Sequence, residues 1–488
     1  MADEKGLTKR ADDFAAWYNE LVLRAELADY SPVRGSMVIR PYGYGIWELM
    51  QRGLDDRFKA TGHQNAYFPL LIPQSYLERE KQHIAGFAPE VAVVTHAGGK
   101  ELEEPLVIRP TSETIIYAMF AKWVQSYRDL PILMNQWANV VRWELRTRLF
   151  LRTSEFLWQE GHTAHATEAE AEEEARRMLG VYREFMETEM AMPPLTGEKT
   201  ESERFAGAVR TYACEALMQD NRGLQAGTSH NLGQNFSRQF EFRFQTEAGG
   251  EEYAWNTSWG VSTRLVGALV MTHGDDAGLV LPPALAPIQV VVVPIYRTED
   301  ERALVLEKAG TVANVLRQER VRVHIDDRDT LKPGPKFYEW ERKGVPVRVE
   351  IGPRDVAAQK LTVVFRRDLI PEVPRKESMD EAVALMTIPR RLPEYQRALL
   401  EAAIARREEH SHRGVTEYGA FRELIDGAAG FVYTGWCGSA ECEAKVKEET
   451  KATIRLIPLE EFRSSDRPER CIACGSGAAE EVVWARAY

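Results

Sequence analysis

One stretch of the chain, residues 139–165, combines charged and aromatic side chains at the spacing of a β-hairpin, since two alternating apolar segments flank a short basic connection. Its chemistry lies in five residues: Arg142, Glu144, Arg152, Phe156 and Glu160. Because side chains alternate along a strand, the first two are predicted to share a face of one strand and the last three a face of the other. Guanidinium groups match phosphate oxygens, carboxylates accept from amines, and a phenyl ring stacks on a base. The pattern fits either a nucleotide site or structural Arg–Glu bridges.

A second polar group precedes a strongly periodic helix. Residues 107–113 read VIRPTSE, and an apolar stripe recurs at helical spacing from Ile115 to Val124. Thr111 or Ser112 can cap this helix, with Glu113 in its favourable first turn. Alternatively, Thr111 and Glu113 hold the ammonium group of an amino acid at the end of the preceding strand.

Two further segments carry candidate ligand groups. Residues 200–208 form a polar loop around a single aromatic residue, Phe205. Residues 224–236, LQAGTSHNLGQNF, contain small residues that permit close backbone approach to a ligand. A lone histidine such as His230 is more often a satisfied structural residue, but its setting in this run makes it a candidate for the site.

Four of the five cysteines form two tight pairs near the C-terminal end of the sequence: Cys437 with Cys442, and Cys471 with Cys474. Two thiolate pairs at this spacing suit a tetrahedral zinc site. Disulfides are disfavoured in a reducing cytosol. The alternatives are free thiols or a degenerate site.

Composition and charge exclude some classes of protein. The 488 residues carry a net charge of −12, which argues against a surface coated for nonspecific nucleic-acid binding. The first residues lack the apolar core of a signal peptide, and no apolar run approaches membrane-spanning length. We therefore expect a cytoplasmic protein without a membrane-spanning segment.

The elements that must position these groups are predicted to form more than one domain. A proline-rich segment, 281–287, marks a boundary. The following segment, 288–294, is continuously apolar, as in a strand buried on both faces. Strands alternate with helices from there to residue 365, which predicts a small α/β domain with a mostly parallel sheet.

Three motifs occur in an order that resembles the class II aminoacyl-tRNA synthetases. The hairpin resembles motif 2, WGVSTR at 259–264 resembles motif 3, and GHQNAYFP at 62–69 resembles motif 1, the dimer element of that family. RPTSE at 109–113 is similar to the amino-acid pocket of the subclass that contains the prolyl, threonyl, histidyl and glycyl enzymes. Together with FLRTSEFLWQEG at 150–161 and GTSHNLGQNFS at 227–237, it resembles the prolyl-tRNA synthetases of the archaeal/eukaryote-like type.

The resemblance covers essentially the whole chain and implies a multidomain α+β and α/β fold. It implies a catalytic domain around an antiparallel sheet at 1–283, a small α/β anticodon-binding domain at 284–395, and a zinc-binding α/β domain at 396–488. It also implies a homodimer formed through motif 1.

The implied activity is ATP-dependent ligation of L-proline to tRNA(Pro) through prolyl-adenylate, with Mg²⁺ accompanying ATP and Zn²⁺ in a structural role. Arg142 would bridge the proline carboxylate and the α-phosphate, and Glu144 would bind the adenine amine. Phe156 and Arg264 would enclose the base, while Arg152 and Arg264 would hold the outer phosphates.

The resemblance assigns further residues to three sites. The proline pocket would contain Thr111, Glu113, Arg142, Trp158, Glu160, Phe205 and His230. The ATP site would also include Thr153, Gln225, Thr228 and Ser262. The anticodon would contact Phe337, Glu341, Arg348 and Arg354.

Two alternatives remain at this stage. One is a synthetase of the same subclass for another amino acid, and the other is a synthetase-like RNA-binding or regulatory protein without ligase activity. Many bacterial prolyl enzymes carry an editing domain between motifs 2 and 3. Residues 160–260 are all needed for the helix, loop and strands of the core, so no inserted editing domain is expected.

Overall fold

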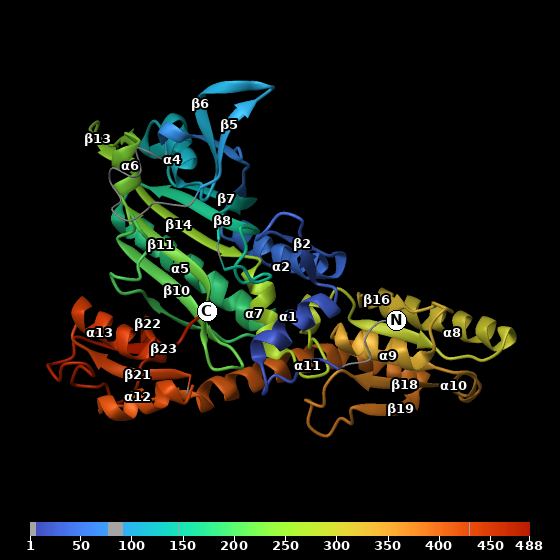
Figure 1. Cartoon of the computed structure of the whole chain (residues 1–488). Coiled ribbons are helices and arrows are strands. Elements are labelled where there is room, and N and C mark those ends of the chain that lie inside the picture. Colours follow the sequence, from blue (N-terminus) through green and yellow to red (C-terminus); the bar gives the residue numbers. More distant parts are fainter. Residues whose placement is uncertain (1–5, 77–90, 145, 429) are drawn as a thin grey trace.

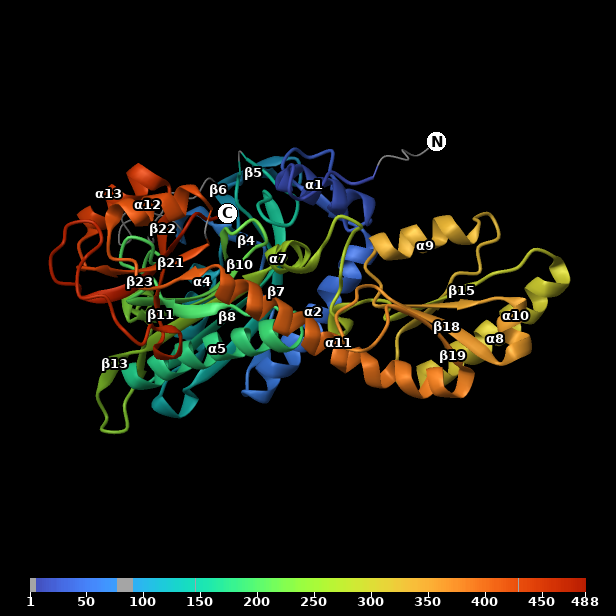
Figure 2. The same ribbon diagram turned by 90° about the horizontal axis from the view of Figure 1, so that it is seen from below.

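The computed structural model describes residues 6–76, 91–144, 146–428 and 430–488. Leu145, in the predicted basic connection, lies outside the described residues. Figure 1 shows a large sheet with helices packed on it, a smaller α/β unit beside it, and a long helix, α11 (Glu381–Glu409), which passes between them. The same helix runs along the underside of the large sheet in Figure 2.

The described residues form a central sheet of eleven strands. In spatial order these are β20 (Ser411–His412), β21 (Phe431–Trp436), β23 (Glu480–Ala485), β22 (Thr453–Pro458), β9 (Leu195–Glu198), β10 (Arg210–Leu217), β11 (Gly223–Gly233), β14 (Trp255–Ser262), β8 (Glu155–His165), β7 (Ile132–Val141) and β3 (Gln64–Asn65). Neighbouring strands are antiparallel except at the β3–β7 and β20–β21 pairs. The antiparallel catalytic sheet expected from the motifs is therefore present.

The predicted hairpin forms, but its strands are shorter than expected. β7 ends at Val141 and β8 begins at Glu155, so Arg142, Glu144 and Arg152 lie on the connection and not on the strands. The prediction that these three occupy strand faces was wrong.

Apolar residues within the connection explain this difference. Leu149, Phe150 and Leu151 are buried in the main core, and the backbones of Arg148 and Arg152 hydrogen-bond to each other on either side of them. Burial of these three side chains favours a connection outside the strand ladder. If the three residues continued a strand, their side chains would alternate between its faces and could not all enter the same core.

Helices cover one face of the sheet and enclose its largest core. They are α5 (Glu168–Thr188), α2 (Pro41–Ala60), α1 (Phe14–Arg24) and α7 (Arg264–His273). α5 begins at a capping box between Thr167 and Glu170, and its buried stripe includes Met178, Tyr182 and Phe185. Apolar residues on one side of the Glu- and Ala-rich segment 167–190 predict a helix over that range, within two residues of the observed bounds at each end.

The segment around motif 1 contains less regular structure than expected. The sequence of residues 67–72 predicts a buried strand, but β3 ends at Asn65 and the next strand, β4, begins at Leu71. Tyr67 is 73 % exposed, whereas Phe68 is buried.

Smaller elements lie around the sheet. They are β1 (Ala28–Tyr30), β2 (Met37–Ile39), β4 (Leu71–Pro73), β5 (Val93–Ala97), β6 (Lys100–Ile108), β12 (Arg243–Gln245), β13 (Glu251–Tyr253), α4 (Glu113–Trp123), α6 (Asn235–Gln239) and the 3₁₀ turns η1 (Tyr127–Asp129), η2 (Pro283–Leu285) and η3 (Glu460–Phe462).

The α/β unit follows the predicted alternation of strands and helices. Its elements are β15 (Val290–Pro294), α8 (Glu299–Gln318), β16 (Val323–Ile325), α9 (Pro333–Arg342), β17 (Val347–Ile351), α10 (Pro353–Ala358), β18 (Lys360–Phe365) and β19 (Lys376–Asp380). The sheet order is β16-β15-β17-β18-β19. The first three strands are parallel and the last two are antiparallel to their neighbours, so the sheet is mixed rather than mostly parallel.

The C-terminal segment adds α12 (Tyr418–Asp426), α13 (Ala440–Thr450) and four strands that extend the catalytic sheet. The junction is the β22–β9 pair, where Ile457 lies opposite Glu198. A buried ion cluster crosses the same junction, because Glu215 contacts both Lys199, at 2.7 Å, and Arg455, at 2.7 Å. The last part of the chain is therefore continuous with the catalytic sheet. No described helix combines the length and the apolar character needed to cross a membrane.

One glycine allows the helices to approach the sheet. A Cβ on Gly161 would lie 2.1 Å from the ring of Trp259, which is buried between β8 and α5. Gly161→Ala is expected to lower the free energy of unfolding by about 2–3 kcal/mol, because the indole cannot move without disturbing the core. Gly180→Ala on α5, where an added Cβ meets nothing within 4 Å, is the control and should stabilise by about 0.5–1 kcal/mol. Urea unfolding measures both, and equal stability of the two variants would contradict this packing.

Candidate active site

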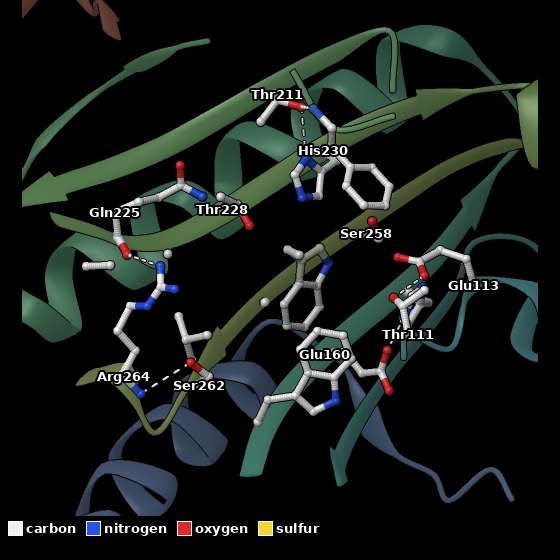
Figure 3. Close-up of a pocket in the computed structure, with 18 of the residues that line it drawn as sticks. Thr111, Glu113, Glu160, Thr211, Gln225, Thr228, His230, Ser258, Ser262 and Arg264 are labelled. Atoms are coloured by element: carbon white, nitrogen blue, oxygen red, sulfur yellow. Dashed lines mark hydrogen bonds and ion pairs between the residues drawn. The ribbon is translucent and has the colours of Figure 1, made fainter. Parts of the chain in front are cut away.

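A cavity of about 340 Å³ opens on the face of the sheet that α5 does not cover. Gln159 on β8 points toward α5, where its amide oxygen accepts a hydrogen bond from Tyr182 at 2.5 Å. Its neighbours Trp158 and Glu160 therefore point to the opposite face and line the cavity. Figure 3 shows Glu113 and Glu160 at one end of this cavity and Arg264 at the other.

The acidic end is held by hydroxyl, amide and imidazole groups. Glu160 accepts from Ser112 at 2.5 Å and from Gln136 at 2.8 Å, and it lies 2.9 Å from His162. Burial raises the pKa of Glu160, but the hydrogen bonds and charge of His162 and the donors Ser112 and Gln136 outweigh that effect, so its pKa lies below the ordinary value. Thr111 donates to Glu113. This end of the cavity is a negatively charged pocket suited to an ammonium group.

Arg142 lies between aromatic rings at the entrance to the acidic end. Its guanidinium carbon is 5.2 Å from the centre of the Trp158 ring and 5.7 Å from that of Phe156, and its Nε donates to the carbonyl of Pro110 at 2.9 Å. Although solvent reaches Arg142 through the cavity, the surrounding protein lowers its pKa. A guanidinium that has lost part of its hydration interacts more strongly with an added anion than one that is fully hydrated.

Arg264 lies at the opposite end of the cavity. Its side chain donates to the carbonyl of Leu151 at 3.2 Å and to that of Gln225 at 3.4 Å, and its backbone N–H donates to Ser262 at 3.2 Å. Burial lowers the pKa of Arg264, and the positive charges of Arg152 and Arg142 lower it further. Because three guanidinium groups repel one another here, a polyanion would relieve their repulsion.

A histidine and a phenyl ring close the upper wall. His230 Nδ1 is 2.9 Å from the hydroxyl of Thr211, and the ring of Phe205 lies 4.6 Å from that of His230. Burial, with a smaller contribution from nearby His162, lowers the pKa of His230 to about 3. His230 is therefore neutral near pH 7 and adds no positive charge to a pocket that suits an ammonium group.

Most of the residues predicted for the site meet in this cavity. Those that line it are Thr111, Glu113, Arg142, Phe156, Trp158, Glu160, Phe205, Gln225, Thr228, His230, Ser262 and Arg264. Glu144, Arg152 and Thr153 do not line it. Arg152 and Glu144 are 3.6 Å apart and partly exposed, and Thr153 donates to the carbonyl of Glu155.

Several residues that shape the site escaped the sequence analysis. Glu203, Thr211 and Ser258 line the cavity, and Ser112 and Gln136 hold Glu160. Strand alternation could have indicated His162, two positions after Glu160 on the same strand. No local signal could have indicated Gln136, because its place opposite Glu160 depends on the register between β7 and β8.

The four cysteines predicted as metal ligands come together. The sulfur atoms of Cys437, Cys442, Cys471 and Cys474 all lie within 4.8 Å of one another. Cys437 is 3.6 Å from Cys442 and 3.8 Å from Cys474, too far for disulfides. Zinc–sulfur bonds of about 2.3 Å in a tetrahedron place the sulfurs about 3.8 Å apart, so this cluster fits a four-coordinate zinc ion.

The residues predicted to contact an anticodon lie on the α/β unit. Phe337 and Glu341 are one turn apart on α9, and the Arg348 guanidinium lies 4.2 Å from the centre of the Phe337 ring. Glu341 forms an ion pair with Arg375. Arg354 is exposed near the start of α10.

Three parts of the chain match known protein families. Residues 94–273 match the class II tRNA synthetase core domain of the G, H, P, S and T enzymes, residues 289–385 match the anticodon binding domain, and residues 418–488 match the C-terminal domain of prolyl-tRNA synthetase.

Whole-chain comparisons agree with these matches. The chain is 55 % identical to a proline–tRNA ligase of Chlorobium phaeobacteroides, with all of both chains covered, and 55 % identical to one of Chloroflexus aurantiacus, with 99 % of each covered. A crystal structure of prolyl-tRNA synthetase from Cryptosporidium parvum, complexed with halofuginone and AMPPNP, is 40 % identical, with a TM-score of 0.92 and 99 % of each chain covered. The chain therefore belongs to the prolyl-tRNA synthetases, as a class II synthetase core joined to an anticodon-binding domain and the family's C-terminal domain.

Proposed function

We propose that the protein ligates L-proline to tRNA(Pro) in two steps. The proline carboxylate attacks the α-phosphorus of ATP, which expels pyrophosphate and leaves prolyl-adenylate. The terminal ribose hydroxyl of the tRNA then attacks the acyl carbon and releases AMP. The observation that carries the proposal is the separation of charge within one cavity: carboxylates at one end, the guanidinium of Arg264 at the other, and Arg142 near the junction.

In this proposal the acidic end binds the amino acid. The proline ammonium pairs with Glu113 and Glu160, which are fixed by Thr111 and Ser112. Trp158, Phe205 and neutral His230 surround the apolar ring of proline.

The basic end binds ATP, which enters as its magnesium complex. Arg264 and Phe156 enclose the adenine, Glu144 accepts from its exocyclic amine, and Arg152 and Arg264 hold the outer phosphates. Gln225 lines the cavity beside Arg264 and can offer an oxygen to the Mg²⁺ that accompanies ATP. Thr153, Thr228 and Ser262 complete this end of the site.

Arg142 links the two substrates in the first step. Its fork can donate to the proline carboxylate and to an α-phosphate oxygen at once, which a lysine cannot do. Negative charge grows on the α-phosphate in the transition state, and a cation already in place stabilises that charge with little reorganisation. The chemistry then needs no protein nucleophile, because positioning and charge neutralisation suffice.

We further propose the three domains 1–283, 284–395 and 396–488, the last boundary falling within α11. Phe337, Glu341, Arg348 and Arg354 contact the anticodon, where an aromatic ring and charged groups can stack on and bind unpaired bases. A homodimer forms through motif 1, where exposed Tyr67 offers apolar surface. Zn²⁺ occupies the cysteine cluster, and cysteines that form no disulfide suit the reducing cytoplasm.

Arg142→Ala is expected to reduce proline-dependent pyrophosphate exchange by about 10²–10³-fold or more, since it removes charge stabilisation made mainly in the transition state. Arg142→Lys should also be poor. Exposed Arg146 does not line the cavity, so Arg146→Ala should exchange pyrophosphate as the unmodified protein does. Exchange by folded Arg142→Ala at the unmodified rate would disprove the assigned role. Repeating the assay with each amino acid tests whether another substrate is preferred to proline.

The zinc ion is expected to be structural, because four cysteines leave no coordination position open for a substrate. Elemental analysis of freshly purified, reduced protein should find one zinc per chain. Replacing Cys471 and Cys474 with serine should release the metal and lower the melting temperature, while exchange at saturating proline persists below that temperature. Cys214→Ala, in the buried core, should keep its zinc. The assignment would be refuted if the unmodified protein contained no zinc, or if removal of the metal left its melting temperature unchanged.

The proposed enzyme is expected to activate alanine detectably, because each missing methylene offers only about 1–3 kcal/mol of discrimination. Residues 160–260 belong to strands β8 to β14, helices α5 and α6 and their connections, so the described chain offers no separate hydrolytic domain between motifs 2 and 3. Preformed alanyl-tRNA(Pro) should therefore survive incubation with the purified protein. Rapid deacylation that depends on the protein would show that another part of the chain edits.

A further inference from the structure

The loop between β9 and β10 forms part of the wall of the amino-acid pocket. It places Glu203 and Phe205 on the cavity. On its inner side, the backbone N–H of Phe205 donates to Thr211 at 3.1 Å, and the hydroxyl of Thr211 lies 2.9 Å from His230. The position of the Phe205 ring against His230 therefore depends on where this loop lies.

The outer side of the same loop rests on α13, a helix of the C-terminal segment. The hydroxyl of Thr200 donates to Glu443 at 2.9 Å, and both side chains are buried. Lys447, one helical turn further on, forms an ion pair with Glu203 at 3.1 Å. Glu443 and Lys447 are four residues apart, so one face of α13 supports the loop at two points.

The two contacts differ in strength. The Thr200–Glu443 bond joins a carboxylate to a hydroxyl away from water, where such bonds are strong and costly to leave unmade. The Lys447 side chain is 58 % exposed, so water and salt screen its pair with Glu203. Glu443 is therefore the main support and Lys447 a weak one.

α13 is itself well anchored. Ser439 caps its first turn, Val446 and Thr450 are buried, and the neighbouring strand β22 pairs with β9, the strand that leads into the loop. A displacement of the loop toward solvent is thus resisted by a helix whose neighbouring strand pairs with the strand that leads into the loop. Arg264 and Gln225, at the basic end of the cavity, contact neither α13 nor this loop in the described hydrogen bonds and ion pairs.

We infer that Glu443, with a smaller contribution from Lys447, is a positioning residue for the amino-acid pocket, acting through Thr200 and Glu203 to hold Phe205 against the bound amino acid. The inference rests on the proposed activation of proline. It gives the C-terminal segment an indirect part in amino-acid binding.

The test is pyrophosphate exchange with proline and ATP varied separately. Glu443→Ala should raise the KM for proline about tenfold, because a buried hydrogen bond to a carboxylate is lost, while the KM for ATP changes less than twofold. Thr200→Val, which removes the same bond from the other side, should give a similar rise. The double variant should be no worse than either single variant, since both delete one interaction.

Three controls separate positioning from general damage. Glu443→Gln keeps an acceptor oxygen and should retain a KM for proline within about threefold of the unmodified value. Lys447→Ala should raise it by no more than about threefold. Glu448→Ala, on an exposed position of the same helix, should change neither KM. Thermal unfolding confirms that each variant is folded. If Glu443→Ala does not fold, Thr200→Val alone tests the inference.

The outcomes are distinct. An unchanged KM for proline in folded Glu443→Ala and Thr200→Val, or equal rises in both KM values, would overturn the inference while the proposed function stands. Failure of the unmodified protein to exchange pyrophosphate with proline would overturn the proposed function and this inference with it.

Discussion

The register between neighbouring strands of the central sheet is the constraint on which the site depends. Glu160 on β8 lies opposite Gln136 on β7 and opposite Gly260 on β14, and Gly260 lies opposite Thr228 on β11. Directly opposed residues share a face, so a one-residue slip of β8 would turn the Glu160 carboxylate into the core, and a one-residue slip of β14 would turn the indole of Trp259 into the cavity.

Small residues on β14 keep the floor of the cavity open. Ser258, Gly260 and Ser262 lie opposite His162, Glu160 and Trp158, respectively, so they occupy the cavity-facing positions. Their intervening neighbour Trp259 fills the core on the other face, where Gly161 makes room for its ring. Because side chains alternate along a strand, β14 leaves room for a ligand on the cavity face and packs densely on the core face.

The charged side chains of the cavity depend on their surroundings as well as on strand register. Glu160 keeps a low pKa in a buried position through three specific partners, whereas Arg142 and Arg264 have lowered pKa values because protein replaces water around them. Charged groups that are already held in place need little reorganisation when the substrates bind. The C-terminal segment belongs to the same system, since β22 joins β9 and α13 contacts the loop that carries Phe205.

The sequence by itself determined most of the residues that line the cavity, the four cysteines that come together, and their order along the chain. Motif order, the cysteine pairs and the periodicity of α5 are local patterns, and the structure places the four cysteines together and α5 within two residues of its predicted bounds. Local patterns suffice there because helix periodicity and ligand spacing involve residues close in sequence.

The tertiary structure decided the rest. Arg142, Glu144 and Arg152 lie outside the strands. The reason is that Leu149, Phe150 and Leu151, in the same connection, are buried in the main core. The partners of Glu160 and the union of the C-terminal strands with the catalytic sheet depend on pairings between segments far apart in the chain. Such pairings are selected by the packing of the whole molecule, so no single stretch of sequence encodes them.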